Sequence, residues 1–135
     1  MHRQKILHTL AVLIFIIAFL HGLGMWYSFY DTIWHYDKLL HFLGGLFVSL
    51  LLFWIYFLSG YIKPRYRPTA LTLLLIAFVG VVVVGSGWEL FEWLLGFRWY
   101  PEGYWADTLG DVLADGAGGL VGFLVLTWRY GVKRQ

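Results

Sequence analysis

The chain has 135 residues, a length typical of a single domain, and 60% of them are apolar while only 13% are charged. A soluble domain carries about a quarter charged residues, so this composition cannot build a water-facing surface and predicts a protein embedded in the lipid bilayer. The absence of cysteine excludes disulfides, thiolate metal sites and a cysteine nucleophile, and the net charge of +2 is too small to argue for a nucleic-acid partner.

Four apolar runs are long enough to cross a bilayer, which needs roughly 20 residues per helix. Pro64 and Pro68 interrupt the chain between the second and third runs, and Pro101 interrupts it before the fourth. The prediction is an all-α, polytopic membrane protein, a four-transmembrane-helix bundle forming a single membrane domain over residues 1–135. The expected spans are residues 6–30, 39–58, 70–95 and 109–128.

The first run follows the basic residues Arg3 and Lys5, a pattern that also occurs in cleaved signal peptides. No small-x-small cleavage site follows this run, and the apolar stretch is long for a signal peptide. We therefore expect it to remain in the membrane as the first helix.

The second run carries a histidine near its start. Asp37 and His41 are four residues apart, so a helix places them on one face, and Gly44 and Gly45 follow one turn deeper. The spacing fits a polar pair at a helix end, and it also fits a metal ligand or general base at His41. What the other helices bring to the same depth decides between these interpretations.

The third and fourth runs carry acidic residues at helical spacing. Glu89 and Glu92 share a face of the third helix, while Asp107, Asp111 and Asp115 form one stripe on the fourth. At 1.5 Å per residue, Asp115 lies about 12 Å along the helix axis from Asp107, well inside the hydrocarbon. Beside the acidic stripe runs a stripe of small residues, which favours close packing against another helix. The small residues are Gly110, Ala114, Gly118 and Gly122.

Basic and acidic residues segregate along the chain. With four spans, the basic residues before the first run, between the second and third, and after the fourth all fall on one side, which the positive-inside rule makes cytoplasmic. Every acidic residue falls in the outer connections or the outer halves of the helices. We therefore expect a multi-pass protein of the inner (cytoplasmic) membrane with both termini in the cytoplasm. The basic residues on the cytoplasmic side are Arg3, Lys5, Lys63, Arg65, Arg67, Arg129, Lys133 and Arg134, and only Lys38 and Arg98 fall on the other side.

Acidic and histidine side chains of three helices reach one depth in the outer half of the bundle. Facing lipid is costly for an ionisable group, so we expect these side chains to meet in one polar cluster. So many carboxylates cannot all stay ionised, and some must be protonated, paired with cations or bound to a divalent metal. A hydrogen-bonded network that only holds the helices together is the alternative. The cluster comprises Asp37, His41, Glu89, Glu92, Asp107, Asp111 and Asp115, with Glu89, Glu92, Asp111, Asp115 and His41 as candidate metal ligands.

Several of these motifs resemble a known family. The opening of the second run looks like the Asp-Lys-x-x-His-Phe motif of VanZ-like membrane proteins, and the fourth run is similar to their Asp-x-x-x-Asn-x-x-Gly-x-x-x-Gly pattern. In the third run the family has a glutamate followed three residues later by glutamine. The departures are Glu92 for glutamine and Asp115 for asparagine, and both add negative charge. The matching residues are Asp37, Lys38, His41, Phe42, Glu89, Asp111, Gly118 and Gly122.

Other features look closer to the related YjdF-like inner-membrane proteins, a group of unknown function. The resemblance to the two groups covers roughly residues 31–128 and implies a polytopic protein of the cell envelope. The founding member of the VanZ-like family is associated with resistance to the glycopeptide antibiotic teicoplanin. The features shared with the YjdF-like group are Gly44-Gly45, Glu89-x-x-Glu92 and Asp107-Thr108-x-x-Asp111.

Three classes of function fit this pattern. In the first, the polar cluster binds an outer-leaflet lipid headgroup, a cation or a partner. In the second, it is the site of a metal-dependent enzyme that acts on a lipid-linked substrate or cell-wall precursor, with His41 as base. In the third, it relays protons or cations in a coupled transporter. Binding is the preferred hypothesis. Ser86 precedes Glu89 without the setting of a nucleophile, and so short a chain encloses little room for transport unless it forms a homo-oligomer.

Overall fold

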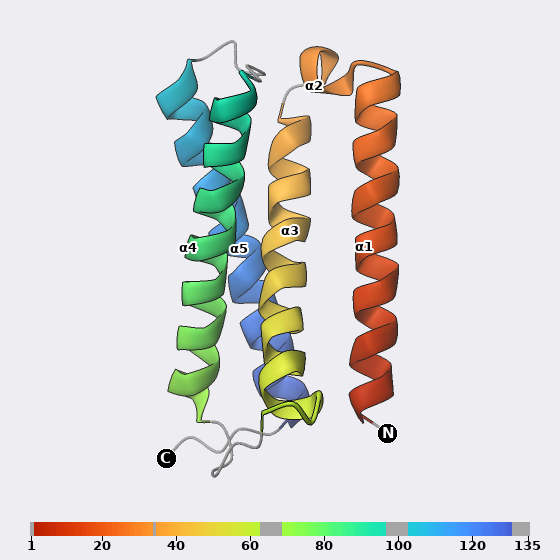
Figure 1. The fold of residues 1–135 in the computed structure, drawn as a ribbon, viewed down its shortest axis with the longest axis vertical. Coiled ribbons are helices and arrows are strands. Elements are labelled where there is room, and N and C mark those ends of the chain that lie inside the picture. The colour runs from red at the N-terminus through yellow and green to blue at the C-terminus, as the bar shows by residue number, and fades with distance from the viewer. Residues whose placement is uncertain (1, 34, 63–68, 97–102, 131–135) are drawn as a thin grey trace.

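The computed structural model describes residues 2–33, 35–62, 69–96 and 103–130, and every regular element in these ranges is helical. Four of the helical segments are long and apolar enough to cross a membrane, which confirms the prediction of an all-α protein with four candidate spans (Figure 1). A short helix, α2, connects the first two spans. The elements are α1 (His2–Trp26), α2 (Phe29–Thr32), α3 (Tyr36–Phe53) with a π-helical extension η1 (Trp54–Leu58), α4 (Ala70–Leu95) and α5 (Tyr104–Tyr130).

The helix ends differ from the limits of the apolar runs. Helix α1 ends four residues before the expected limit at residue 30, because Ser28 takes a left-handed backbone conformation with φ 54°. Helices α3 and α5 begin at Tyr36 and Tyr104, earlier than the expected residues 39 and 109, because their first turns contain polar residues that a hydropathy pattern does not count. The basic residues at positions 63, 65, 67, 133 and 134 and the prolines at 64, 68 and 101 lie outside the described residues.

Helix α3 lies at the centre of the bundle and packs against α1, α4 and α5. Within the described ranges, the backbone of α1 approaches α2, α3 and η1 but neither α4 nor α5, so α1 stands at one side of the bundle (Figure 1). The first residues of α1 and the last residues of α5 lie at the same end. The opposite end, where α3 and α5 begin, is called the cluster end below.

Small residues allow α3 and α5 to approach closely. A Cβ atom added at Gly118 would overlap the carbonyl oxygen of Phe42, and one added at Gly122 would overlap the hydroxyl of Ser49. On the facing helix, a Cβ at Gly45 would overlap the carbonyl oxygen of Asp115. The small-residue stripe of α5 therefore lies against α3, with Gly110 next to the Lys38 side chain at one end and half-buried Ala114 between.

Buried apolar and buried ionisable side chains are concentrated toward opposite ends of the bundle. The apolar core lies near the beginning of α1 and the end of α5, and its outward faces carry exposed side chains such as Phe15 and Phe78, as expected for contact with lipid. The buried ionisable residues lie toward the cluster end. The core residues are Ile6, Leu10, Leu50, Phe53, Leu73 and Leu126.

Candidate functional site

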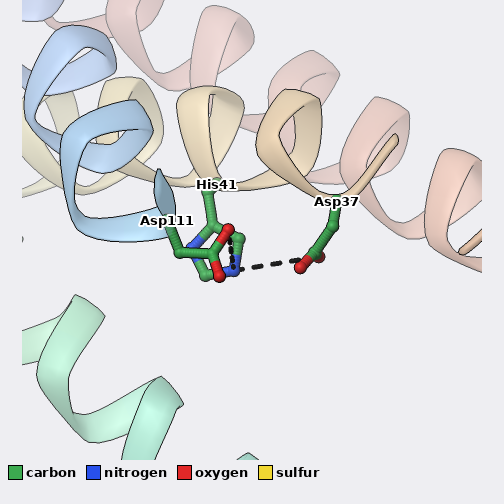
Figure 2. Close-up of side chains that lie close together, drawn as sticks. All are labelled: Asp37, His41 and Asp111. Carbon is green, nitrogen blue, oxygen red and sulfur yellow. Dashed lines mark ion pairs between the residues drawn. The ribbon is translucent and has the colours of Figure 1, made fainter. Parts of the chain in front are cut away.

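His41 of α3 is the centre of a polar cluster to which α4 and α5 also contribute. Its Nδ1 atom lies 3.3 Å from Oδ2 of Asp115, within hydrogen-bonding distance. Its Nε2 atom lies 3.8 Å from Oδ1 of Asp37 and 3.7 Å from Oδ1 of Asp111, as Figure 2 shows. Oε1 of Glu89 lies 3.9 Å from the same nitrogen. The two sides of the imidazole therefore face different carboxylates.

Lys38 is the cation of this cluster that sequence analysis did not count among the site residues. Its Nζ atom pairs with the carboxylate of Asp107, lies 2.8 Å from Oδ1 of Asp111, and also donates to the Asp107 backbone carbonyl at 3.3 Å. The lysine thus joins α3 to two successive turns of α5. The sequence offers one clue to this role. Lys38 has no acidic residue four positions further along α3 with which to pair, so a partner on another helix was to be expected.

Glu89 and Glu92 bring α4 into the cluster. Oε2 of Glu89 accepts a hydrogen bond of 2.8 Å from the hydroxyl of Thr108, which fixes one oxygen of the carboxylate against α5. Glu89 is buried and Glu92 is half-buried. Ligand atoms of His41, Glu89 and Glu92 all lie within 4.8 Å of one another, as do those of Asp37, His41 and Asp111, so each trio could hold a metal ion.

Three buried side chains of the cluster have polar atoms without a hydrogen-bond partner among the described residues. These atoms are Nε2 of His41, Oε1 of Glu89 and Oδ2 of Asp111. The exposed fractions of the three residues are 6%, 8% and 0%. A buried polar atom left without a partner costs about 1–3 kcal/mol, so this arrangement calls for a ligand, a proton or an ion.

The cluster also carries an excess of negative charge. The cluster contains six carboxylates, against Lys38 and the imidazole of His41. Because ionised groups of one sign repel strongly in a low dielectric, six carboxylates with one permanent cation favour binding of a further positive charge. The carboxylates are those of Asp37, Glu89, Glu92, Asp107, Asp111 and Asp115.

Two glycines make room for Asp115 between α3 and α4. A Cβ atom at Gly85 would lie 2.5 Å from Oδ2 of Asp115, and the Gly45 backbone packs directly on the Asp115 backbone. A larger residue at either position would displace the carboxylate from His41. The glycines therefore position the functional group as well as the helices.

A cavity of about 290 Å³ lies between α1, α3 and α4, next to the cluster. His41 and Asp115 line it, whereas Asp37, Glu89 and Asp111 do not. Most of the wall is apolar, and the remaining polar side chains, His21 and Tyr30, are also toward the cluster end. The apolar lining residues are Ile14, Ile17, Ala18, Leu40, Val48, Val81, Val84 and Trp88, together with Gly44, Gly45 and Gly85.

His21 and Tyr30 form a hydrogen-bonded pair at this end of the cavity, with 2.6 Å between Nδ1 and the phenolic oxygen. Burial, together with the nearby negative charge of Asp37, raises the pKa of the Tyr30 hydroxyl above its ordinary value of 10.0. The tyrosine therefore keeps its proton, and its hydroxyl can donate to Nδ1 of His21 or accept from it, depending on the tautomer of the imidazole.

The structure places all seven residues of the predicted cluster toward the cluster end and divides four of the carboxylates between the two nitrogens of His41. Asp115, one of the predicted metal ligands, lies on the Nδ1 side of the imidazole. Asp37 approaches Nε2 of His41 together with Asp111. Helical spacing places side chains on a face but does not say which nitrogen of His41 each one meets.

Comparison with known proteins identifies a matching family. Its sequence profile, described as Predicted membrane protein (DUF2238), matches residues 1–132 of the chain. No curated protein and no solved structure matches. The family description agrees with the four candidate spans, and the likeness to VanZ-like and YjdF-like proteins stays a resemblance of motifs.

Proposed function

This chain belongs to the family described as Predicted membrane protein (DUF2238), and we propose that it binds a membrane lipid with an amine headgroup in the cavity beside His41. The polarity of that cavity carries the proposal. Along α1, α3 and α4 its lining runs from His21, His41 and Trp88 near the cluster end to Ile14, Val48 and Val81 deeper in the bundle. An amphiphile with one polar end and one apolar chain matches this division.

The position of α1 supports entry of such a ligand from the bilayer. Helix α1 packs on α3 but its backbone does not approach α4 in the described ranges, so lipid chains reach the cavity between these two helices without crossing water. The cavity volume of about 290 Å³ is close to the lower limit of small-molecule sites, roughly 300 Å³. One acyl chain and part of a headgroup therefore fit better than a whole phospholipid.

The charge of the cluster supports an amine headgroup. Asp115 lines the cavity directly, and the carboxylates behind it outnumber the cations. A primary ammonium group carries one positive charge and three hydrogen-bond donors, which suit a carboxylate-rich end of a low-dielectric cavity. His21 lines the same cavity, and in the tautomer whose Nδ1 accepts from Tyr30 its Nε2–H can donate to a phosphate or ester oxygen of the same lipid.

Binding accounts for the geometry better than catalysis or transport does. The carboxylates on the Nε2 side of His41 do not line the cavity, so a metal-dependent enzyme would hold its ion away from the bound substrate. A transporter needs a polar path across the membrane, whereas the described part of the opposite end is filled by the apolar core around Phe53, Leu73 and Leu126. The buried ionisable side chains lie toward the cluster end, so they are suited to a ligand at one face of the membrane.

We assign the cluster end to the outer face of the inner membrane. Arg3 and Lys5 near the start of α1 and Arg129 near the end of α5 lie toward the opposite end, and the remaining basic residues of this set follow η1 or α5 in the sequence, which favours a cytoplasmic location for both termini. The bound lipid then comes from the outer leaflet, in agreement with the envelope role that the VanZ-like motifs imply.

Cysteine labelling tests this orientation, and the chain has no native cysteine to interfere. Trp105 and Tyr61 lie near opposite ends of the bundle, with exposed fractions of 82% and 88%. In intact spheroplasts, a membrane-impermeant maleimide is expected to label Trp105→Cys and to label Tyr61→Cys only after permeabilisation. The reverse pattern would invert the topology and move the lipid site to the inner leaflet.

Lipid binding is testable by photo-crosslinking in vesicles of phosphatidylethanolamine and phosphatidylglycerol, with a diazirine in one acyl chain of the ethanolamine lipid. Crosslinks are expected at Ile17, Val48 and Val84 of the native protein. Ile17→Trp fills the cavity and should reduce these crosslinks about tenfold, equivalent to about 1.4 kcal/mol of binding free energy. Unlabelled ethanolamine lipid should compete better than unlabelled glycerol lipid.

Ile16→Trp is the matched control, since Ile16 is 39% exposed on the same helix and does not line the cavity. This variant should crosslink like the native protein. Crosslinks spread evenly over all lipid-facing helices, and unchanged by Ile17→Trp, would refute specific binding. Equal competition by the two headgroups would refute the amine preference alone.

A further inference from the structure

We propose that Nε2 of His41 and the carboxylates of Asp37, Glu89 and Asp111 bind one divalent transition-metal ion. Figure 2 shows Asp37 and Asp111 beside Nε2 of His41, and Glu89 of α4 approaches the same nitrogen, whereas Asp115 lies on the Nδ1 side of the ring. This inference goes beyond lipid binding and does not depend on it, because none of the three carboxylates lines the cavity. Only His41 belongs to both sites.

The distances around Nε2 fit metal ligands better than hydrogen bonds. Carboxylate oxygens of Asp37, Glu89 and Asp111 lie 3.7–3.9 Å from this nitrogen, beyond the usual hydrogen-bond range of about 2.7–3.2 Å. Bonds of about 2.0–2.2 Å to one tetrahedral ion place two ligand atoms roughly 3.3–3.6 Å apart. Each of these oxygens is within a few tenths of an ångström of that separation from Nε2, and the ligand atoms of Asp37, His41 and Asp111 all lie within 4.8 Å of one another. Glu89, whose ligand atom is grouped with those of His41 and Glu92, must move further toward Asp37 and Asp111 to join the same ion.

The hydrogen bond on the other side of the ring prepares His41 as a ligand. An ionised carboxylate only accepts hydrogen bonds, so the contact between Nδ1 and Asp115 places the proton of a neutral imidazole on Nδ1. Nε2 then carries a lone pair directed toward Asp37 and Asp111. Metal-binding histidines commonly donate their second N–H to a carboxylate in this way, which fixes the tautomer and the ring orientation.

Buried atoms without partners give a second, independent indication. Nε2 of His41, Oε1 of Glu89 and Oδ2 of Asp111 have no hydrogen-bond partner in the described part of the chain, and each residue is more than nine-tenths buried. All three belong to groups that lie around Nε2. In Asp111, Oδ1 lies 3.7 Å from Nε2 and 2.8 Å from Nζ of Lys38, while Oδ2 has no partner among the described residues, so the carboxylate can contact an ion and the lysine together.

The donor set indicates the class of ion. One imidazole and several carboxylates, with no thiolate in the chain, suit Zn²⁺, Mn²⁺ or Fe²⁺, whereas Mg²⁺ and Ca²⁺ prefer oxygen ligands alone. A divalent ion offsets two of the three carboxylate charges and Lys38 offsets one more, so the ion reduces the excess of negative charge in the cluster. Glu92, within 4.8 Å of His41 and Glu89 by their ligand atoms, is available as an additional ligand.

Metal uptake by the purified full-length protein in detergent tests the site. Protein stripped with a chelator and then dialysed against Zn²⁺ or, separately, Mn²⁺ should retain about one ion per chain by elemental analysis. Its thermal midpoint should rise by several degrees, since a ligand that binds only the folded state stabilises it. Native protein that retains neither ion and shows no shift in either metal would overturn the proposal.

Matched variants locate the ion. His41→Gln and Asp111→Asn should each lower the affinity at least about tenfold, the low end of losses at ligand and supporting positions. His8→Gln and Asp31→Asn carry the same changes at exposed positions away from the cluster and should bind like the native protein. Retention of the ion by His41→Gln and Asp111→Asn would place it elsewhere and overturn the assignment.

Two further measurements keep the test decisive. If a cluster variant fails to fold, uptake of Co²⁺ by the native protein reports on the site, because ligation by His41 gives a visible absorption spectrum that differs from that of aqueous Co²⁺. An unchanged spectrum would count against the site. Ile17→Trp should keep the metal while losing the lipid, so failure of one proposal is distinguishable from failure of the other.

Discussion

Gly118→Leu is expected to prevent stable assembly of the helix bundle. At this position a side chain would meet the carbonyl oxygen of Phe42 and the backbone nitrogen of Leu46, neither of which can move away by changing a rotamer. Overpacking that flexible side chains absorb costs about 1–3 kcal/mol, and a clash with backbone should exceed that range. In membranes, close approach of helices through small residues is a main source of their association.

Gly116→Leu provides the control for this prediction. Gly116 lies two residues away on α5, and an added Cβ there meets nothing within 4 Å. Size-exclusion chromatography after heating in detergent should show early loss of the monodisperse peak for Gly118→Leu and a native-like profile for Gly116→Leu. Equal thermal stability of the two variants would contradict the contact between α3 and α5.

Lys38→Met should be the most destabilising single change within the polar cluster. The lysine pairs with Asp107 and Asp111, whose exposed fractions are 5% and 0%, and its removal leaves both carboxylates without a permanent cation. Breaking a buried ion pair from one side typically costs 3–5 kcal/mol. Because the Lys38 side chain is 17% exposed, we expect a loss of about 3 kcal/mol, at the lower end of that range.

Lys5→Met is the matched control, since Lys5 is exposed near the start of α1, far from the cluster. A second comparison separates charge from packing: adding Asp107→Asn to Lys38→Met should recover part of the lost stability, because a neutral amide needs no counter-charge. Thermal unfolding in detergent measures all three proteins. Equal midpoints for Lys38→Met and Lys5→Met would show that the ion pair does not support the fold.

The sequence by itself determined the number of spans and the faces that carry acidic residues. Both depend on local properties: a run of about 20 apolar residues suffices to cross lipid, and a spacing of four residues places Asp111 and Asp115 on one side of a helix whatever surrounds it. The small-residue stripe at Gly118 and Gly122 is local in the same sense, and the structure places it against α3.

Only the tertiary structure decided how these faces meet. The pairing of Lys38 with α5, the division of the carboxylates between the two nitrogens of His41, and the cavity left by α1 all depend on the rotation and separation of helices distant in sequence. Rotation of each helix is set by packing against its neighbours, such as the fit of Gly45 on Asp115. The spacing of residues along one helix does not determine that packing, because all helices of the bundle contribute to it together.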